Sequence, residues 1–152
     1  MYVQGMNEIL ATLYYCFWGS SKQYTEYFES DLFFCFSMVM SDLRDGFIRT
    51  MDSEDTGING RIKKFIQFFE QVDGQLINHI NKFNVQPNFY ALRWLMLMLA
   101  QDFELANVIK IWDTLLSDTT RWNFVFYICI AIVQLKRDKI LKGDFSDIME
   151  AL

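Results

Sequence analysis

Apolar residues recur every three or four positions along most of this chain, which is the spacing of amphipathic α-helices. The pattern predicts helices near 6–18, 24–47 and 62–76, and a short final helix over 145–152. Gly74 weakens the third of these by about 1 kcal/mol relative to alanine and marks a place where that helix can break. No run alternates between polar and apolar residues for long enough to indicate a β-strand.

The segment 87–117 is the stretch around which the rest of the predicted fold is organised. Between residues 90 and 100 only Arg93 is charged, so this helix has no solvent face and is expected at the centre of the domain. Pro87 suits the first helical turn, because the backbone N–H that proline lacks would have no partner within the helix at that position. Asp102 is predicted to cap a second helix, and the two helices are expected to form a tight hairpin in the core.

Other segments complete a single all-α domain of about seven helices. Residues 122–135 form another nearly all-apolar helix, and the polar, acidic stretch 50–60 is expected to be an exposed loop. The basic residues of 136–142 are interpreted as a solvated helix face whose cations complement the helix dipole. A chain of 152 residues with 52% hydrophobic residues can bury a sizeable core, which excludes a disordered protein.

Charge and hydropathy exclude several classes of partner. The formal net charge is -5, whereas a general nucleic-acid surface would need a basic stripe. The amino end lacks the basic residues that begin a signal peptide. The longest apolar run, 124–133, is shorter than the roughly 20 residues needed to cross a bilayer, so no direct membrane insertion is expected.

The residues that usually carry metal or nucleophilic chemistry are sparse. Cys16, Cys35 and Cys129 form no CxxC pair, and each is predicted to be a core thiol in a reduced, intracellular compartment. His79 is the only histidine, so a zinc site or a Ser–His hydrolase is not expected. The glycines at 57–60 mark a turn or a helix entry, because the chain has no phosphate-binding or nucleophile-elbow motif.

Two separated motifs identify a resemblance to a known family. The later motif consists of Arg93-Trp94, then Asp102-Phe103, then 112–116, with 89–91 directly before it. The first motif is the octapeptide Tyr2-Val3-Gln4-Gly5-Met6-Asn7-Glu8-Ile9. Together they resemble TBC domains, the GTPase-activating domains for Rab-type small GTPases, and the resemblance runs through most of the chain.

This resemblance implies a role for each residue of the first motif. Gln4 would be the glutamine finger, inserted in trans into a Rab GTPase, because a neutral carboxamide can accept a hydrogen bond from the attacking water and donate one to a phosphate oxygen. Tyr2 would pack beside the finger, Gly5 would allow close approach of the backbone, and Asn7 would hold the turn by local hydrogen bonds. GTP and Mg²⁺ would belong to the partner, so this chain would need no cofactor or metal of its own.

Residues of the later motif are expected to be structural. Arg93 could be mistaken for an arginine finger, but a buried guanidinium persists only when it is paired, and Asp102 and Asp113 are candidate partners. Trp94, Phe103 and Trp112 are expected to be core aromatic residues and not part of a cofactor site.

The catalytic arginine of the family lies in an I-x-x-D-x-x-R motif upstream of the glutamine motif, and 1–152 begins at the latter. The chain is therefore expected to be a partial TBC domain without the amino-terminal helices of the family. Because an arginine finger contributes roughly 10³–10⁵ in rate, this part alone is expected to be inactive.

Two functions of different classes remain open at this stage. In the first, the parent protein regulates vesicle trafficking by activating Rab GTP hydrolysis, and it is not itself an enzyme with a small-molecule site. Family membership would place that protein in the cytoplasm, peripheral to Rab-bearing membranes. In the second, the chain is a non-catalytic helical module that binds a GTPase or serves as a scaffold. An intact glutamine motif favours the first, and the absent arginine favours the second for this chain alone.

Overall fold

The structure is a computed structural model that describes residues 4–20, 26–47 and 57–152. Within those ranges the chain forms eight α-helices, one short 3₁₀ helix and no β-strand, which confirms the all-α prediction. The basic segment and the final segment form two separate short helices, one more than the sequence pattern indicated. In order the elements are α1 (Met6–Ser20), α2 (Phe28–Phe47), α3 (Gly57–Lys82), the 3₁₀ helix η3 (Pro87–Phe89), α4 (Ala91–Leu97), α5 (Leu105–Ser117), α6 (Arg121–Gln134), α7 (Arg137–Lys142) and α8 (Phe145–Ala151).

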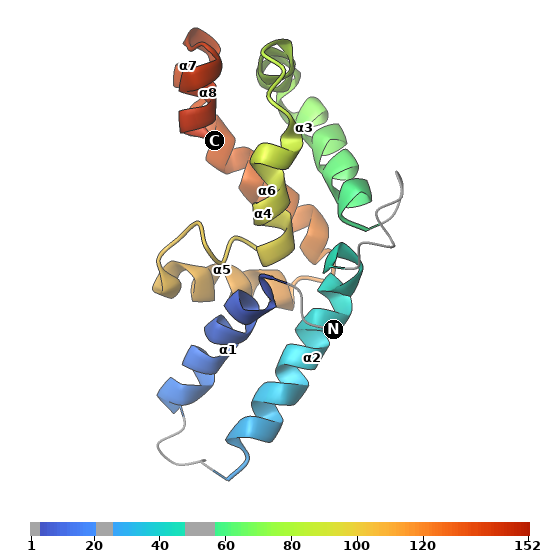
Figure 1. The fold of residues 1–152 in the computed structure, drawn as a ribbon, viewed down its shortest axis with the longest axis vertical. Coiled ribbons are helices and arrows are strands. Elements are labelled where there is room, and N and C mark those ends of the chain that lie inside the picture. Colours follow the sequence, from blue (N-terminus) through green and yellow to red (C-terminus); the bar gives the residue numbers. More distant parts are fainter. Residues whose placement is uncertain (1–3, 21–25, 48–56) are drawn as a thin grey trace.

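The helices are arranged as a body with a projecting arm (Figure 1). In the body, α3 packs against α4, α6 and α7, and α8 packs beside α7 at the end of the molecule. The helices α1 and α2 lie side by side and extend together away from the body, and we call this pair the α1–α2 arm. The arm joins the body where α1 meets α4 and α5 and where α2 meets α3 and α4.

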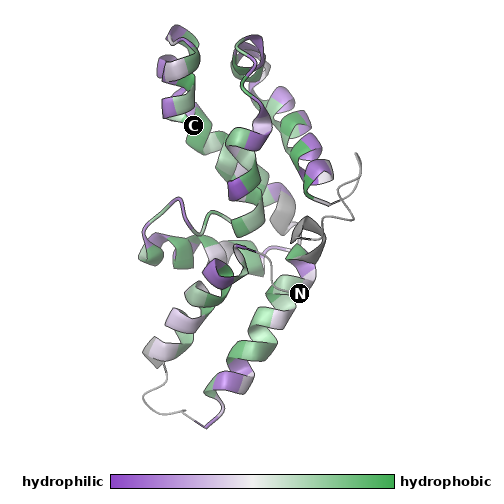
Figure 2. Ribbon diagram, in the orientation of Figure 1, coloured by the Kyte–Doolittle hydropathy of each residue, from purple (hydrophilic) through white to green (hydrophobic). Residues whose placement is uncertain are grey.

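The hydrophobic core surrounds α4, as its apolar sequence predicted. Trp94 and Leu95 are buried there, and Tyr90, directly before the helix, is buried as well. Phe65 of α3 lies with its ring centroid 6.4 Å from that of Tyr90 and 6.0 Å from that of Phe126 on α6. Figure 2 shows hydrophobic and hydrophilic residues alternating along α3, as expected for a helix with one buried face.

The predicted exposed loop over 50–60 is too long at its carboxyl end. Helix α3 begins at Gly57, and both Ile58 and Gly60 are buried. Ile58 lies four residues before Ile62, so it continues the apolar face of α3 by one turn. Residues 48–56 lie outside the described part of the chain.

The predicted tight hairpin of α4 and α5 is wrong. Helix α4 ends at Leu97, and the following segment changes direction before α5 begins at Leu105. Helix α5 then packs mainly against α1 and α6, and Figure 1 shows it crossing below the end of α4. The N-cap of α5 is Glu104 and not Asp102, because the Asp102 carboxylate is held by side chains of α4.

The three cysteines differ in their environments. Cys129 is fully buried on α6, which confirms its predicted place in the core, and this burial raises the pKa of its thiol. Cys16 and Cys35 are only half-buried, at the edge of the core. Across the described ranges, no helix combines the length and the apolar character needed to span a membrane.

Candidate functional site

The predicted finger residue lies at the amino end of the α1–α2 arm. Gln4 is exposed in a turn directly before α1, and Gly5 follows it in a buried position. Gly5 has a φ of 103°, and its carbonyl accepts a hydrogen bond from the Glu8 N–H at 3.2 Å. An L-residue rarely adopts such a φ, so this bend depends on glycine. The bend thus leads from the exposed Gln4 into the first turn of α1.

The first turns of α1 are anchored to the body. Ile9 is fully buried, and the Thr12 hydroxyl donates to the Glu8 carbonyl at 3.1 Å. Asn7 Nδ2 donates to Glu8 Oε1 at 3.2 Å, and its proposed support of the finger stays a prediction. Tyr2 lies outside the described residues. The base of the Gln4 turn is therefore fixed by packing, while the side chain itself is accessible.

Replacing Gly5 by alanine should destabilise the protein by about 1–3 kcal/mol, because the new side chain would be forced into a positive φ. Chemical denaturation of the purified variant measures this loss. Gly74→Ala is the matched control, since a Cβ built at Gly74 meets nothing within 4 Å. Equal stability of the two variants would show that the bend before α1 does not require glycine.

The later motif forms a compact cluster at the end of α4. Asp102 Oδ1 accepts from Arg93 Nη2 at 2.6 Å and from Trp94 Nε1 at 3.0 Å. The Asp102 side chain is only 11% exposed, whereas that of Arg93 is 57% exposed. The predicted pairing of Arg93 is thus confirmed with Asp102, but its predicted burial is wrong. Asp113 lies on the exposed side of α5. Phe103 is exposed as well, so its predicted place in the core is wrong.

A change of chain direction without glycine lies inside this cluster. Met98 and Leu99 both have positive φ, 47° and 65°, although an L-residue there costs about 1–2 kcal/mol. Trp112 Nε1 donates to the Met98 carbonyl at 2.9 Å, and the Leu99 N–H donates to the Trp94 carbonyl at 3.1 Å. Both strained residues are buried. The motif residues Trp94, Asp102 and Trp112 therefore hold the segment that joins α4 to α5.

Removing the Arg93 side chain by Arg93→Ala should lower stability by about 1–3 kcal/mol, because the nearly buried Asp102 carboxylate loses its charged donor. Thermal unfolding compares this variant with Lys110→Ala, which removes an exposed cation from α5. An unchanged melting curve, together with lost GTPase activation when the same substitution is made in a form extended upstream through the arginine motif, would instead assign Arg93 a catalytic role.

A second polar cluster joins α3 to α7, and sequence reasoning missed it. Asp73 has non-helical angles, φ -148° and ψ 74°, and its Oδ1 accepts from the Leu76 N–H at 3.1 Å, so it restarts α3 as a cap. Arg137 Nε donates to Asp73 Oδ2 at 2.8 Å, and Arg137 Nη2 donates to Gln75 Oε1 at 2.7 Å. Gln134 donates to the same carboxylate at 3.4 Å.

The prediction that 136–142 is only a solvated helix face is therefore wrong in part, because Arg137 of α7 binds Asp73 of α3. The break expected at Gly74 occurs one residue earlier, at Asp73. The sequence signal that could have located this break is an aspartate in the middle of an apolar helical pattern, followed directly by glycine. The Arg137 guanidinium lowers the pKa of the Asp73 carboxyl.

The pairing predicts a pH dependence. Because the folded pKa of Asp73 lies below its ordinary value near 3.8, this group contributes stability above that pH and loses it as the pH falls further. In Arg137→Gln the loss on acidification should be smaller, since less of the contribution exists at neutral pH. Urea unfolding of wild type, Arg137→Gln and the exposed-site control Lys142→Gln at neutral pH and near pH 3 measures the difference. Identical pH profiles for all three would contradict the pairing.

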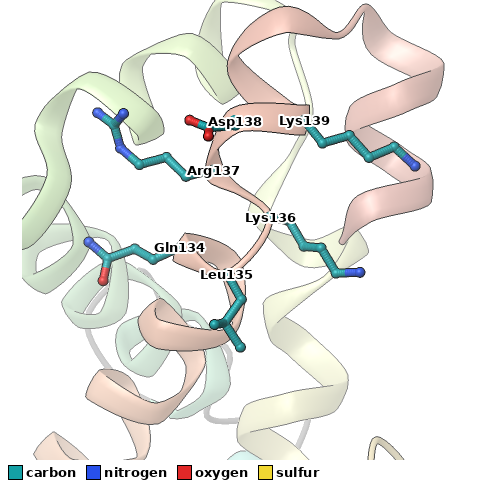
Figure 3. A pocket seen from close by; sticks show the side chains of 6 residues that line it. All are labelled: Gln134, Leu135, Lys136, Arg137, Asp138 and Lys139. Carbon is teal, nitrogen blue, oxygen red and sulfur yellow. The ribbon is translucent and has the colours of Figure 1, made fainter.

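A shallow surface pocket of about 350 Å³ lies where α6 meets α7 (Figure 3). Figure 3 shows Gln134 and Arg137 extending to one side of this corner and Leu135 and Lys136 to the other. The polar groups on the first side already bind Asp73, and Lys139 Nζ donates to Glu150 Oε2 at 2.7 Å. The described part of the chain holds no group of three metal-binding side chains. We therefore assign no ligand to this pocket.

Comparisons with known proteins agree with the two motifs. The Rab-GTPase-TBC domain family matches residues 1–141. Human TBC1 domain family member 13 is 40% identical over 152 residues, which cover 99% of this chain and 38% of that protein. The GTPase-activating protein GYP1 of Saccharomyces cerevisiae is 30% identical over 93 residues, which cover 61% of this chain and 14% of that protein.

Among solved structures, the Ypt/Rab-GAP domain of Gyp1p superposes with a TM-score of 0.82 at 25% identity. The match covers 98% of this chain and 51% of that chain, so this chain spans about half of the solved domain and less of the curated relatives. The helices described above are therefore arranged as in a Rab-GAP domain. From the match over 1–141 and this shared fold, we conclude that the chain belongs to the Rab-GTPase-TBC domain family.

Proposed function

We propose that this chain is the glutamine-bearing part of a GTPase-activating protein for Rab-family small GTPases. Gln4 enters the nucleotide site of the partner and orients the water that attacks the γ-phosphate. The observation that carries this proposal is the position of Gln4, exposed on the Gly5 bend at the start of an anchored helix and inside the first motif of the family. GTP and Mg²⁺ are bound by the partner GTPase.

The chemistry suits a neutral carboxamide. In phosphoryl transfer to water most of the catalysis comes from positioning and electrostatics, and little from covalent chemistry. The amide oxygen of Gln4 accepts a hydrogen bond from the water, and its NH₂ group donates one to a γ-phosphate oxygen. Because the base of the turn is already fixed by Gly5 and Ile9, little backbone order has to be gained when the finger enters the partner.

The second catalytic group is an arginine from outside this chain. The arginines whose side chains the structure describes are Arg61, Arg93 and Arg137, and each of these three already has a structural partner. Arg61 donates to the Asp42 carbonyl at 2.6 Å, Arg93 to Asp102 and Arg137 to Asp73. None of them stands near the Gln4 motif in the sequence, and none has the I-x-x-D-x-x-R context. The protein that carries this chain acts in the cytoplasm, peripheral to membranes that bear Rab proteins.

Single-turnover GTP hydrolysis by a panel of purified Rab proteins tests the proposal. The comparison is between this chain and a form extended upstream through the arginine motif. We expect strong acceleration of at least one Rab by the extended form and little by this chain alone, because the missing arginine contributes roughly 10³–10⁵ in rate. A folded extended form that binds Rab proteins but accelerates none of them would support the non-catalytic binding module instead.

A further inference from the structure

We propose that one end of the molecule opens by local unfolding while the rest of the chain stays folded. This end, which we call the end unit, consists of the second half of α3 (residues 74–82) together with α7 and α8. Figure 1 shows these segments gathered at one end of the structure, and α7 packs against both α3 and α8. The pair formed by Asp73 and Arg137 holds the unit closed.

The chain enters the end unit at the break in α3. Asp73 has non-helical angles, φ -148° and ψ 74°, so residues 74–82 begin as a new helix. The Asp73 carboxylate caps that helix by accepting from the Leu76 N–H at 3.1 Å. A Cβ built at Gly74 meets nothing within 4 Å, so neighbouring elements do not pack tightly against the backbone at this point. The first half of α3 can therefore stay in place when the second half loses its structure.

The other two connections of the end unit also lie outside helices. Residues 83–86 lead from α3 to η3, and Asn84 there has a positive φ of 56°. Helix α6 ends at Gln134, and α7 begins only after Leu135 and Lys136. Leu135 is 83% exposed, so it does not tie this corner to the body (Figure 3). The unit is therefore joined to the body only through points where a helix is interrupted.

The three helices of the end unit depend on one another. Helix α7 has six residues and α8 has seven, and the second half of α3 is similarly short. Helices shorter than roughly 12–15 residues are only marginally stable in water by themselves. Each of the three nevertheless has a fully buried isoleucine, at Ile77, Ile140 and Ile148. Their stability comes from packing, so the loss of one helix removes the support of the others and the unit opens as a whole.

Polar contacts between α7 and α8 are made within the unit. Lys139 Nζ of α7 donates to Glu150 Oε2 of α8 at 2.7 Å. Asp144 caps α8 by accepting from the Asp147 N–H at 3.1 Å, and Asp147 Oδ2 accepts from the Asp144 N–H at 3.1 Å. None of these bonds involves a residue of the body, so they do not hold the unit against it.

The Asp73–Arg137 pair joins two of the boundaries of the end unit. Asp73 lies at the break in α3, and Arg137 is the first residue of α7. Arg137 Nε donates to Asp73 Oδ2 at 2.8 Å, and Arg137 Nη2 donates to Gln75 Oε1 at 2.7 Å. The Asp73 side chain is only 9% exposed, and a charge-assisted hydrogen bond to such a carboxylate is stronger than a neutral one. Opening of the unit breaks this pair, so the pair favours the closed state.

Hydrogen exchange of the native protein in increasing urea tests this opening. Partial unfolding exposes less surface than global unfolding, so exchange through it depends less on urea. We expect the protected amides of 74–82 and 137–151 to share one free energy of opening, smaller and less dependent on urea than that of the α4 amides. The same free energy and the same urea dependence for all of these amides would overturn the proposal.

Two variants separate the end unit from the body. Arg137→Gln should speed exchange in both segments of the unit together, by at least about tenfold, because a hydrogen bond between charged groups is lost. Lys142→Gln, which removes an exposed cation from the same helix, should leave exchange unchanged. Trp112→Phe should speed exchange in α4 but not in the unit, because Trp112 stays in place when the unit opens. Equal acceleration of both by Trp112→Phe, or separate responses of the two segments to Arg137→Gln, would contradict a single opening unit.

Discussion

Replacing Gln4 by alanine in the upstream-extended protein should lower the activated rate of GTP hydrolysis by roughly 10²–10³-fold, the usual effect of losing one oriented hydrogen-bonding group in a transition state. The affinity for the GTP-bound Rab should change much less, because the carboxamide acts mainly once the water is being activated. Stability should not change, since Gln4 is exposed and lies outside α1. Single-turnover hydrolysis at saturating activator separates the rate from the binding.

Gln67→Ala is the matched control, because Gln67 is an exposed glutamine on α3 in the body of the protein. It should retain the full activated rate. If Gln4→Ala also retained that rate with the same Rab, the water would be oriented by another group, such as a glutamine of the GTPase itself. The chain would then contribute binding surface and not a finger.

Replacing Trp112 by alanine should cost about 3–5 kcal/mol of stability, the largest structural effect that we predict for a single substitution. Trp112 is only 3% exposed, so the change leaves a large cavity between α5 and the core. It also removes the donor to the buried Met98 carbonyl, within a segment where two residues hold positive φ. Because small domains are stable by only about 5–15 kcal/mol, much of this variant should be unfolded or insoluble.

Trp112→Phe separates the hydrogen bond from the packing, since it keeps an aromatic ring but loses the indole N–H. It should cost about 1–3 kcal/mol, measured by urea unfolding. Trp18→Phe, at a site that is 60% exposed, is the control and should change stability by less than about 1 kcal/mol. A Trp112→Phe variant as stable as wild type would mean that packing alone maintains the change of direction after α4.

The elements that were predicted correctly depend on short-range patterns. The helical spacing of apolar residues predicted α1 and most of the long α3. Pro87, predicted in a first helical turn, begins the 3₁₀ helix before α4. A carboxylate partner for Arg93 was expected, and the structure supplies Asp102, one of the two candidates. The place of Gln4 near a helix start followed from the helical spacing of apolar residues that begins at Met6, whereas its role as a finger follows from the resemblance and stays a prediction.

The features that were missed depend on contacts between distant parts of the chain. Met98 and Leu99 have positive φ although neither is glycine, so the sequence gives no local sign of this backbone conformation. Burial and the hydrogen bond from Trp112 to the Met98 carbonyl hold it. Arg93 is exposed although its neighbours are apolar, because the hydrophobic pattern of the neighbours does not give the direction of one side chain. The partner of Asp73 lies 64 residues away in the sequence, on α7.

The exposed apolar side chains of α2 could not be predicted from the sequence for a related reason. Phe34 and Met38 contribute to the same apolar content as the buried residues of that helix, and composition does not distinguish a covered side from an open one. Their exposure becomes visible only when the neighbouring helices are in place.

The most direct test of the central claim is binding of the upstream-extended protein to a Rab protein loaded with GDP and aluminium fluoride, which mimics the γ-phosphate in the transition state. If Gln4 orients the attacking water, wild type should bind this complex at least about 10²-fold more tightly than the GDP complex, and Gln4→Ala should lose most of that preference. Equal preference in wild type and Gln4→Ala would contradict the claim that this chain supplies a catalytic finger.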